Sequence, residues 1–97
     1  MTFAWNSAKD LVNQEKHGVS FAEAQVAFSD PLRYIQKDDK HSSLLEERFF
    51  CHAWVQGRVI TVRFTCRDDT IRIFGAAHWG QGAKAYEDHN QGKRTSV

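Results

Sequence analysis

Hydrophobic and polar residues alternate along residues 48–78, a pattern that predicts a meander of three antiparallel strands. Gln56-Gly57 and Asp68-Asp69 each fit a two-residue hairpin loop between neighbouring strands. Because side chains on a strand point alternately to opposite faces, these loops determine which residues share a face. One face is apolar and is expected to form the core: it holds Phe49, Cys51, Ala53, Val55, Ile60, Val62, Phe64, Cys66, Ile71, Ile73 and Gly75.

The opposite face, which we call the cationic face, combines basic and aromatic side chains and carries no carboxylate. It holds Arg48, Phe50, His52, Trp54, Val59, Thr61, Arg63, Thr65, Arg67, Arg72, Phe74, Ala76 and His78. Guanidinium groups bind phosphates and flat rings stack on bases, so this face suits a single-stranded nucleic acid. The alternative is that its aromatic residues pack beneath a helix while the arginines reach the rim. The pattern leaves both alternatives open.

Two helices are predicted ahead of the meander. Asn6 is suited to cap a helix over residues 7–16. Ser20 and Glu23 have the spacing of a capping box, which predicts a second helix that ends at Asp30-Pro31. Because the helices come before the strands, we predict an α+β fold in which both helices pack on the apolar face of the antiparallel sheet.

The remaining segments are predicted to complete one small domain. Short strands are expected at residues 2–5 and 32–36. Residues 37–43 lack periodicity and are expected to form a loop, and residues 83–89 a short C-terminal helix. We therefore expect a single domain over residues 1–89 and a disordered tail over residues 90–97.

Charge and cysteine content indicate the type of protein. A net charge of +1 over 97 residues argues against strong non-specific binding to nucleic acid and is compatible with a local basic patch. The register separates Cys51 from Cys66 by about 13 Å along the sheet, too far for a disulfide, so both are expected to be buried thiols. Free thiols, no visible signal peptide and no membrane-length apolar run favour a cytoplasmic protein without a membrane partner.

Several common active sites are excluded by their missing motifs. The histidines and cysteines have no metal-ligand spacing and the glycines form no phosphate-binding loop, so we expect no metal and no cofactor. The remaining chemistry is metal-independent cleavage of RNA, which needs a base near the 2′-hydroxyl, positive charge at the phosphate and an acid for the departing oxygen. Lys16 and His17 can transfer these protons if they reach the cationic face; the alternative is that they only stabilise a helix end.

Two runs of residues carry a resemblance to a known family. Lys16-His17-Gly18-Val19-Ser20-Phe21, followed by Glu46-Glu47-Arg48-Phe49, resembles the BrnT toxins of bacterial type II toxin-antitoxin pairs. The resemblance implies a RelE-like fold and a ribonuclease that inhibits translation. It also implies a hetero-oligomer with BrnA, a ribbon-helix-helix antitoxin that neutralises the toxin. Operator DNA would be contacted only indirectly, through the antitoxin.

The resemblance also suggests which residues act. The family's motif positions are Lys16, His17, Glu47, Arg48, Arg67 and Arg72. We expect Arg48 and Arg67 to stabilise the phosphate and Lys16 or His17 to transfer a proton. Glu46 and Glu47 are expected to be solvated acids at a strand edge; the alternative is that Glu47 orients Arg48 or Arg67. The cationic face adds candidate RNA-binding residues, namely Phe50, His52, Arg63, Arg72 and Phe74.

One departure from the family pattern bears on activity. Family members tend to follow the last strand with a basic residue, whereas this chain reads Gly75-Ala76-Ala77-His78. His78 is therefore the candidate to replace that residue and to protonate the departing oxygen. The alternative is a catalytically weak or inactive homologue that acts as an antitoxin-binding regulatory subunit.

Overall fold

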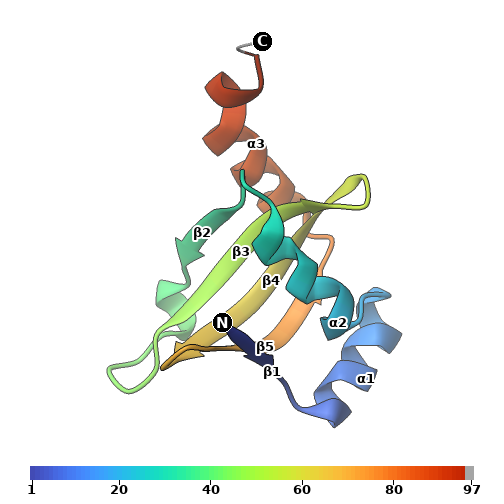
Figure 1. Cartoon of the computed structure of the whole chain (residues 1–97), viewed down its shortest axis with the longest axis vertical. Coiled ribbons are helices and arrows are strands. Elements are labelled where there is room, and N and C mark those ends of the chain that lie inside the picture. Colours follow the sequence, from blue (N-terminus) through green and yellow to red (C-terminus); the bar gives the residue numbers. More distant parts are fainter. Residues whose placement is uncertain (96–97) are drawn as a thin grey trace.

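Five strands form one mixed sheet with three α-helices in the computed structural model, which describes residues 1–95 (Figure 1). The elements are β1 (Thr2–Ala4), α1 (Ser7–His17), α2 (Phe21–Ala24), the 3-10 helix η1 (Gln25–Ser29), β2 (Tyr34–Lys37), the 3-10 helix η2 (Asp39–His41), β3 (Arg48–Val55), β4 (Arg58–Arg67), β5 (Thr70–Ala77) and α3 (Gly80–Thr95). The strand order is β1-β5-β4-β3-β2, with β1 parallel to β5 and the other pairs antiparallel. The predicted α+β class is confirmed.

The hairpin of β3 and β4 has the register expected from the alternation. Arg48 lies opposite Thr65 and Phe50 lies opposite Arg63. In the connecting turn, Gln56 has φ 50° and Gly57 has φ 86°. Two consecutive left-handed residues form the turn type whose twist matches that of the flanking strands. The turn residues therefore fix which side chains of β3 and β4 share a face.

The pairing of β4 with β5 contains a bulge that the sequence pattern does not predict. Arg63 lies opposite Gly75 instead of Phe74, which leaves Phe74 as the extra residue in the ladder. From Gly75 onward, the side chains of β5 therefore point to the face opposite to the one that strict alternation predicts. Ala76 is buried in the core, whereas a Cβ added at Gly75 would lie 3.3 Å from Arg63 Cδ. Our assignments of Gly75 to the apolar face and of Ala76 and His78 to the cationic face were therefore wrong.

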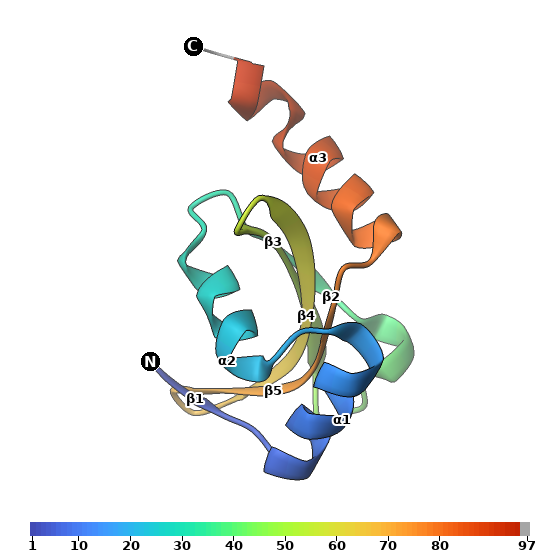
Figure 2. The same ribbon diagram turned by 90° about the vertical axis from the view of Figure 1, so that its right-hand side faces the viewer.

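The second predicted helix packs on the apolar face as α2 and η1, but α1 does not. Phe21, Ala24 and Ala27 are fully buried in the core, and the core residues described in the structure include none from α1. Instead, the Asn13 side-chain amide donates to Ala76 O at 2.8 Å and accepts from Ala76 N at 3.2 Å. Asn13 thereby pairs with β5 beyond the end of β1. Figure 2 shows α2 on one side of β3 and β4, with α1 and α3 on the other.

The C-terminal helix is longer and better anchored than expected. We predicted a short helix over residues 83–89 and a disordered tail over 90–97, but α3 continues to Thr95 and Asn90 is fully buried. Residues 96–97 lie outside the described part of the chain. None of the helices described is long and apolar enough to cross a membrane.

The two cysteines are free thiols in different surroundings. Cys51 is buried, and burial raises the pKa of its thiol to about 12. Cys66 is exposed near the end of β4, so the expectation that both thiols are buried was wrong for Cys66. The alternation assigned Cys66 to the correct face but did not show that the core ends before it.

Candidate functional site

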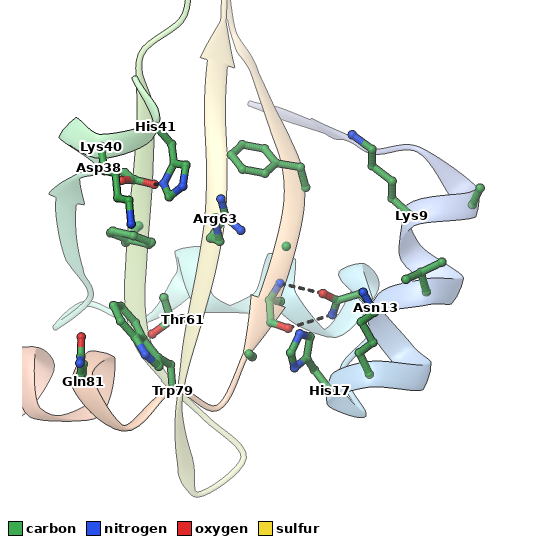
Figure 3. Close-up of a pocket in the computed structure, with 18 residues that line it drawn as sticks. Lys9, Asn13, His17, Asp38, Lys40, His41, Thr61, Arg63, Trp79 and Gln81 are labelled. Atoms are coloured by element: carbon green, nitrogen blue, oxygen red, sulfur yellow. Dashed lines mark hydrogen bonds and ion pairs between the residues drawn. The ribbon is translucent and has the colours of Figure 1, made fainter. Parts of the chain in front are cut away.

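A cavity of about 840 Å³ opens on the cationic face, opposite the core (Figure 3). Its floor is made by β3, β4 and β5, which contribute Phe50, Thr61, Arg63 and Phe74. One wall is α1, with Lys9, Lys16 and His17, and the other includes η2, with Lys40 and His41. Trp79, which precedes α3, and Gln81, in its first turn, close one end. The cavity therefore lies between segments that are far apart in the sequence.

The described residues that line this cavity carry an excess of positive charge. Lys9 extends from α1, Lys40 from η2 and Arg63 from the floor. Lys16 lines the cavity from α1 as well. Asp38 is the one carboxylate among these lining residues; it is 5% exposed and lies 2.8 Å from His41 Nδ1. Cations that face a concave surface attract and concentrate anions. The cavity is therefore suited to a phosphate group or to a chain of them.

Aromatic rings lie between and beside the arginines. The guanidinium carbons of Arg48 and Arg63 lie 4.6 and 5.3 Å, respectively, from the ring centroid of Phe74. Such cation-π contacts hold the guanidinium groups over the ring. Phe50 lies 5.5 Å from Trp79, centroid to centroid, at the other end of the floor. Half-buried rings of this kind provide flat surfaces on which bases can stack.

Lys16 and His17 do reach the cavity. Both lie in the last turn of α1, both are exposed, and both line the cavity wall. Their position depends on α1 lying beside β5, where the Asn13 amide holds it. The structural condition for their use in proton transfer is therefore met.

Arg48 and Arg67 share one carboxylate, that of Glu46. Arg48 Nε donates to Glu46 Oε1 at 2.8 Å and Arg67 Nη2 donates to Glu46 Oε2 at 3.2 Å. The hydrogen bond from Arg48 is the main reason that the pKa of Glu46 is lowered. Glu47 instead forms an ion pair with Lys37 at 3.4 Å, and its side chain is 62% exposed. This agrees with the expected solvated acid and not with the alternative that Glu47 orients these arginines. Extending the period-2 alternation two residues before β3 would have identified Glu46.

Arg48 and Arg67 are not among the residues that line the cavity, and three further candidates also lie outside it. His52 is fully buried, with Nδ1 2.9 Å from Thr61 Oγ1 and Nε2 2.9 Å from Gln36 Oε1, so it offers no surface for RNA. Desolvation lowers the pKa of His52 to about 4. His78 lies near Val59 O and lines a separate small pocket. Arg72 is exposed opposite Thr65, on the cationic face but not at the cavity.

Several residues of the cavity walls were not predicted from the sequence. Lys9, Asp38, Lys40 and His41 line it together with the predicted residues. Three of the four lie in the segment 37–43, which has no periodicity and was assigned only as a loop. The sequence of a loop without periodicity does not show which way its charged side chains point. It therefore contained little that would have placed these residues at the cavity.

The functional groups in the cavity suit acid–base chemistry on an anion. Across residues 1–95, no three His, Cys, Asp or Glu side chains come together as a possible metal site. The cavity instead contains ammonium, guanidinium and imidazole groups. Imidazole transfers protons near neutral pH, whereas ammonium and guanidinium groups stabilise negative charge.

Comparison with known families gives the biological class. Residues 5–81 match a family described as the ribonuclease toxin, BrnT, of type II toxin-antitoxin systems. The chain belongs to this family. All residues that line the large cavity fall inside the matched segment, whereas most of α3 lies beyond it. Membership in the BrnT family implies an antitoxin as partner. No curated protein matched the chain.

Proposed function

We propose that this BrnT family member is an endoribonuclease that cleaves RNA in the large cavity without a metal ion and thereby inhibits translation. The observation that supports this proposal best is the position of Arg63, which lies on the floor of the cavity between basic residues on both walls. We also propose that the α+β fold is of the RelE-like type, as the family resemblance implies.

An RNA strand would lie across the cationic face, with one phosphate in the cavity. Arg63 would hold the phosphate that reacts, because it is the arginine that lines the cavity. Arg48, Arg67 and Arg72 would hold the neighbouring phosphates, because they lie on the same face of β3, β4 and β5 outside it. Bases would stack on the half-buried rings of the floor, and such stacking contributes roughly 1–3 kcal/mol per base.

Cleavage would use the ribose itself as nucleophile. A base removes the proton of the 2′-hydroxyl while its oxygen forms a bond to phosphorus. The bond from phosphorus to the 5′-oxygen breaks, and an acid protonates that oxygen, so the products end in a 2′,3′-cyclic phosphate and a 5′-hydroxyl. Lys16 or His17 would perform one of these proton transfers, and Arg63 would stabilise the charge that develops on the phosphate.

The partner would be a BrnA-like ribbon-helix-helix antitoxin that neutralises the toxin in a hetero-oligomer. Operator DNA would be contacted only through this antitoxin. The family match supports an antitoxin, and the type of antitoxin follows from the resemblance. Covering the cationic face would be sufficient for inhibition, because the candidate RNA site lies there.

A second candidate function is that of a weakly active or inactive toxin homologue that binds the antitoxin for regulation. One observation favours it. The basic residue expected after the last strand is replaced in this chain by His78, and His78 lies at the small pocket beside Val59 instead of in the large cavity. The acid for the departing oxygen must then come from another element.

Incubating the purified chain with single-stranded RNA in excess chelator tests the proposal. We expect fragments with 2′,3′-cyclic phosphate ends, and Arg63→Ala should slow cleavage roughly 100- to 1,000-fold because it removes a preorganised charge. Arg58→Ala is the matched control: Arg58 is an exposed arginine next to the β3–β4 turn, outside the large cavity.

Two results separate the candidate functions. Growth arrest on expressing the chain alone, abolished by Arg63→Ala and retained by Arg58→Ala, supports the ribonuclease. No cleavage and no arrest, together with tight binding to a ribbon-helix-helix antitoxin, would contradict it and support the regulatory homologue.

A further inference from the structure

His41 and Asp38 form a histidine–carboxylate pair on the wall of the cavity opposite α1 (Figure 3). His41 Nδ1 lies 2.8 Å from Asp38 Oδ2. The two side chains differ strongly in exposure, because that of Asp38 is 5% exposed and that of His41 is 45% exposed. A buried carboxylate thus contacts a half-exposed imidazole that lines the cavity.

The backbone fixes this pair to the sheet. Asp38 N donates to Arg48 O at 2.8 Å, and Ser42 Oγ donates to Asp38 O at 2.7 Å. Ser42 Oγ also accepts from Arg48 N at 2.8 Å. The short turn that carries His41 is therefore tied to the first residue of β3 and does not depend on side-chain packing alone.

The hydrogen bond determines which nitrogen of His41 can accept a proton. An ionised carboxylate only accepts hydrogen bonds, so Asp38 requires the proton of a neutral His41 to be on Nδ1. Nε2 then carries the lone pair. A carboxylate held in this way orients the imidazole and stabilises the imidazolium that forms when Nε2 takes up a proton.

The charged groups around His41 are compatible with a phosphate substrate. Lys40 lies next to it on η2, and Arg63 lies on the adjacent floor. Lys9 and His17 lie on α1 across the cavity. Lys16, also on α1, lines the cavity with them. His41 is thus placed beside the site at which several cations would hold the reacting phosphate.

We propose that His41 is the general base of the cleavage step and that Asp38 is its positioning residue. This inference rests on the proposed function, because it assigns a role within RNA cleavage. His41 Nε2 takes the proton of the 2′-hydroxyl as that oxygen bonds to phosphorus. The bond to the 5′-oxygen breaks, and His17 on the opposite wall supplies the proton to that oxygen. The two histidines return to their starting states by exchanging protons with water.

Three variants test this assignment in the RNA cleavage assay with chelator. His41→Ala should slow cleavage roughly 100- to 10,000-fold, the usual range for loss of a general base. Asp38→Asn should also slow cleavage, because its amide can donate to Nδ1 and place the proton on Nε2, the wrong nitrogen. His89→Ala is the matched control, since His89 is an exposed histidine on α3 that stacks on Tyr34 outside the cavity.

Two readouts distinguish catalysis from a structural role. Added imidazole should restore part of the activity of His41→Ala and should not change that of His89→Ala. In addition, the acidic limb of the pH–rate profile should be altered in His41→Ala and Asp38→Asn and retained in His89→Ala. Circular dichroism and thermal unfolding verify folding, and His41→Gln replaces His41→Ala if that variant does not fold.

The outcomes separate the two proposals. If the wild-type chain does not cleave RNA, the proposed function fails and this inference fails with it. If the wild type cleaves RNA and His41→Ala stays within about threefold of His89→Ala, only the assignment of His41 is overturned. Loss of activity in folded His41→Ala without any rescue by imidazole would likewise overturn the role as base.

Discussion

The cationic face has two halves with similar types of residue: a covered half, on which α3 packs, and an open half, which faces the cavity and solvent. In the covered half, His52 is fully buried, and α3 approaches so closely that a Cβ at Gly82 would overlap Oγ1 of Thr61 at the edge of the cavity floor. In the open half, Arg63 faces the cavity and Arg67 is 68% exposed. Residue type alone does not decide between a binding surface and a packing surface. The position of the last helix decides it.

Contacts with the segment before β2 hold α3 over the covered half. Tyr86 OH donates to Asp30 Oδ2 at 2.7 Å, and Asn90 Nδ2 donates to Leu32 O at 2.9 Å. Both Tyr86 and Asn90 are fully buried. Further along, α3 extends away from α1 (Figure 2), so the cavity between α1 and η2 is not covered. We therefore expect variants of the covered half to affect stability and variants of the open half to affect RNA.

The largest stability effect is expected for His52 on acidification. Because desolvation lowers its pKa from 6.5 to about 4, the folded state binds fewer protons than the unfolded state in this range. The free energy of unfolding should therefore fall by roughly 3 kcal/mol as the pH falls from 6.5 to about 4, in addition to the effect of other groups. Chemical denaturation across this range measures it. His52→Gln should remove the contribution of His52 to the dependence of the unfolding free energy on pH. An unchanged dependence would show that His52 is not held in its neutral form in the folded state.

A smaller loss is expected when α3 is pushed away from the sheet. Gly82→Ala places a methyl group against Thr61 Oγ1 and near His52 Nδ1, which should lower the free energy of unfolding by roughly 1–3 kcal/mol. Gly92→Ala is the matched control because nothing lies within 4 Å of its added Cβ. Thermal or chemical unfolding measures both variants. Equal stability of the two would argue against close packing of α3 on this half.

The smallest effect concerns the arginines of the open half. Glu46→Gln removes the negative charge shared by Arg48 and Arg67, so it should tighten binding of RNA about twofold to fivefold at low salt. Glu47→Gln is the control, since Glu47 pairs with Lys37 instead. Fluorescence anisotropy with an RNA that lacks the reactive 2′-hydroxyl measures binding without cleavage. Weaker binding by Glu46→Gln would mean that Glu46 mainly orders the two arginines.

The structural features that could be predicted well from the sequence are those set by regular local patterns. The alternation and the turn at Gln56-Gly57 determine the β3–β4 register, and Asn6 caps α1 as expected, through its side chain and Lys9 N. Ser20 and Glu23 form the predicted capping box. Each of these features depends on residues that are near neighbours along the chain or across a hairpin.

The features that were missed depend on long-range packing. The bulge at Phe74 needs a register shift that no local rule specifies, and it is what removed His78 from the cationic face. The close approach of α3 needs Gly82 to meet Thr61, a pair that only the folded chain brings together. His41 was missed because its partner, Asp38, lies in a segment without periodicity.

The most direct test of the account is a map of the RNA contact on the protein. We propose to follow backbone amide NMR shifts while adding a single-stranded RNA whose 2′-hydroxyls are methylated, which blocks cleavage. An RNA site in the open half predicts large shifts at Arg63, Phe74 and His41. It predicts small shifts at His52, which α3 covers, and at Gly82, which lies on the side of α3 that faces the sheet. Shifts centred on α2 and η1, or on α3 instead of the open half, would contradict it.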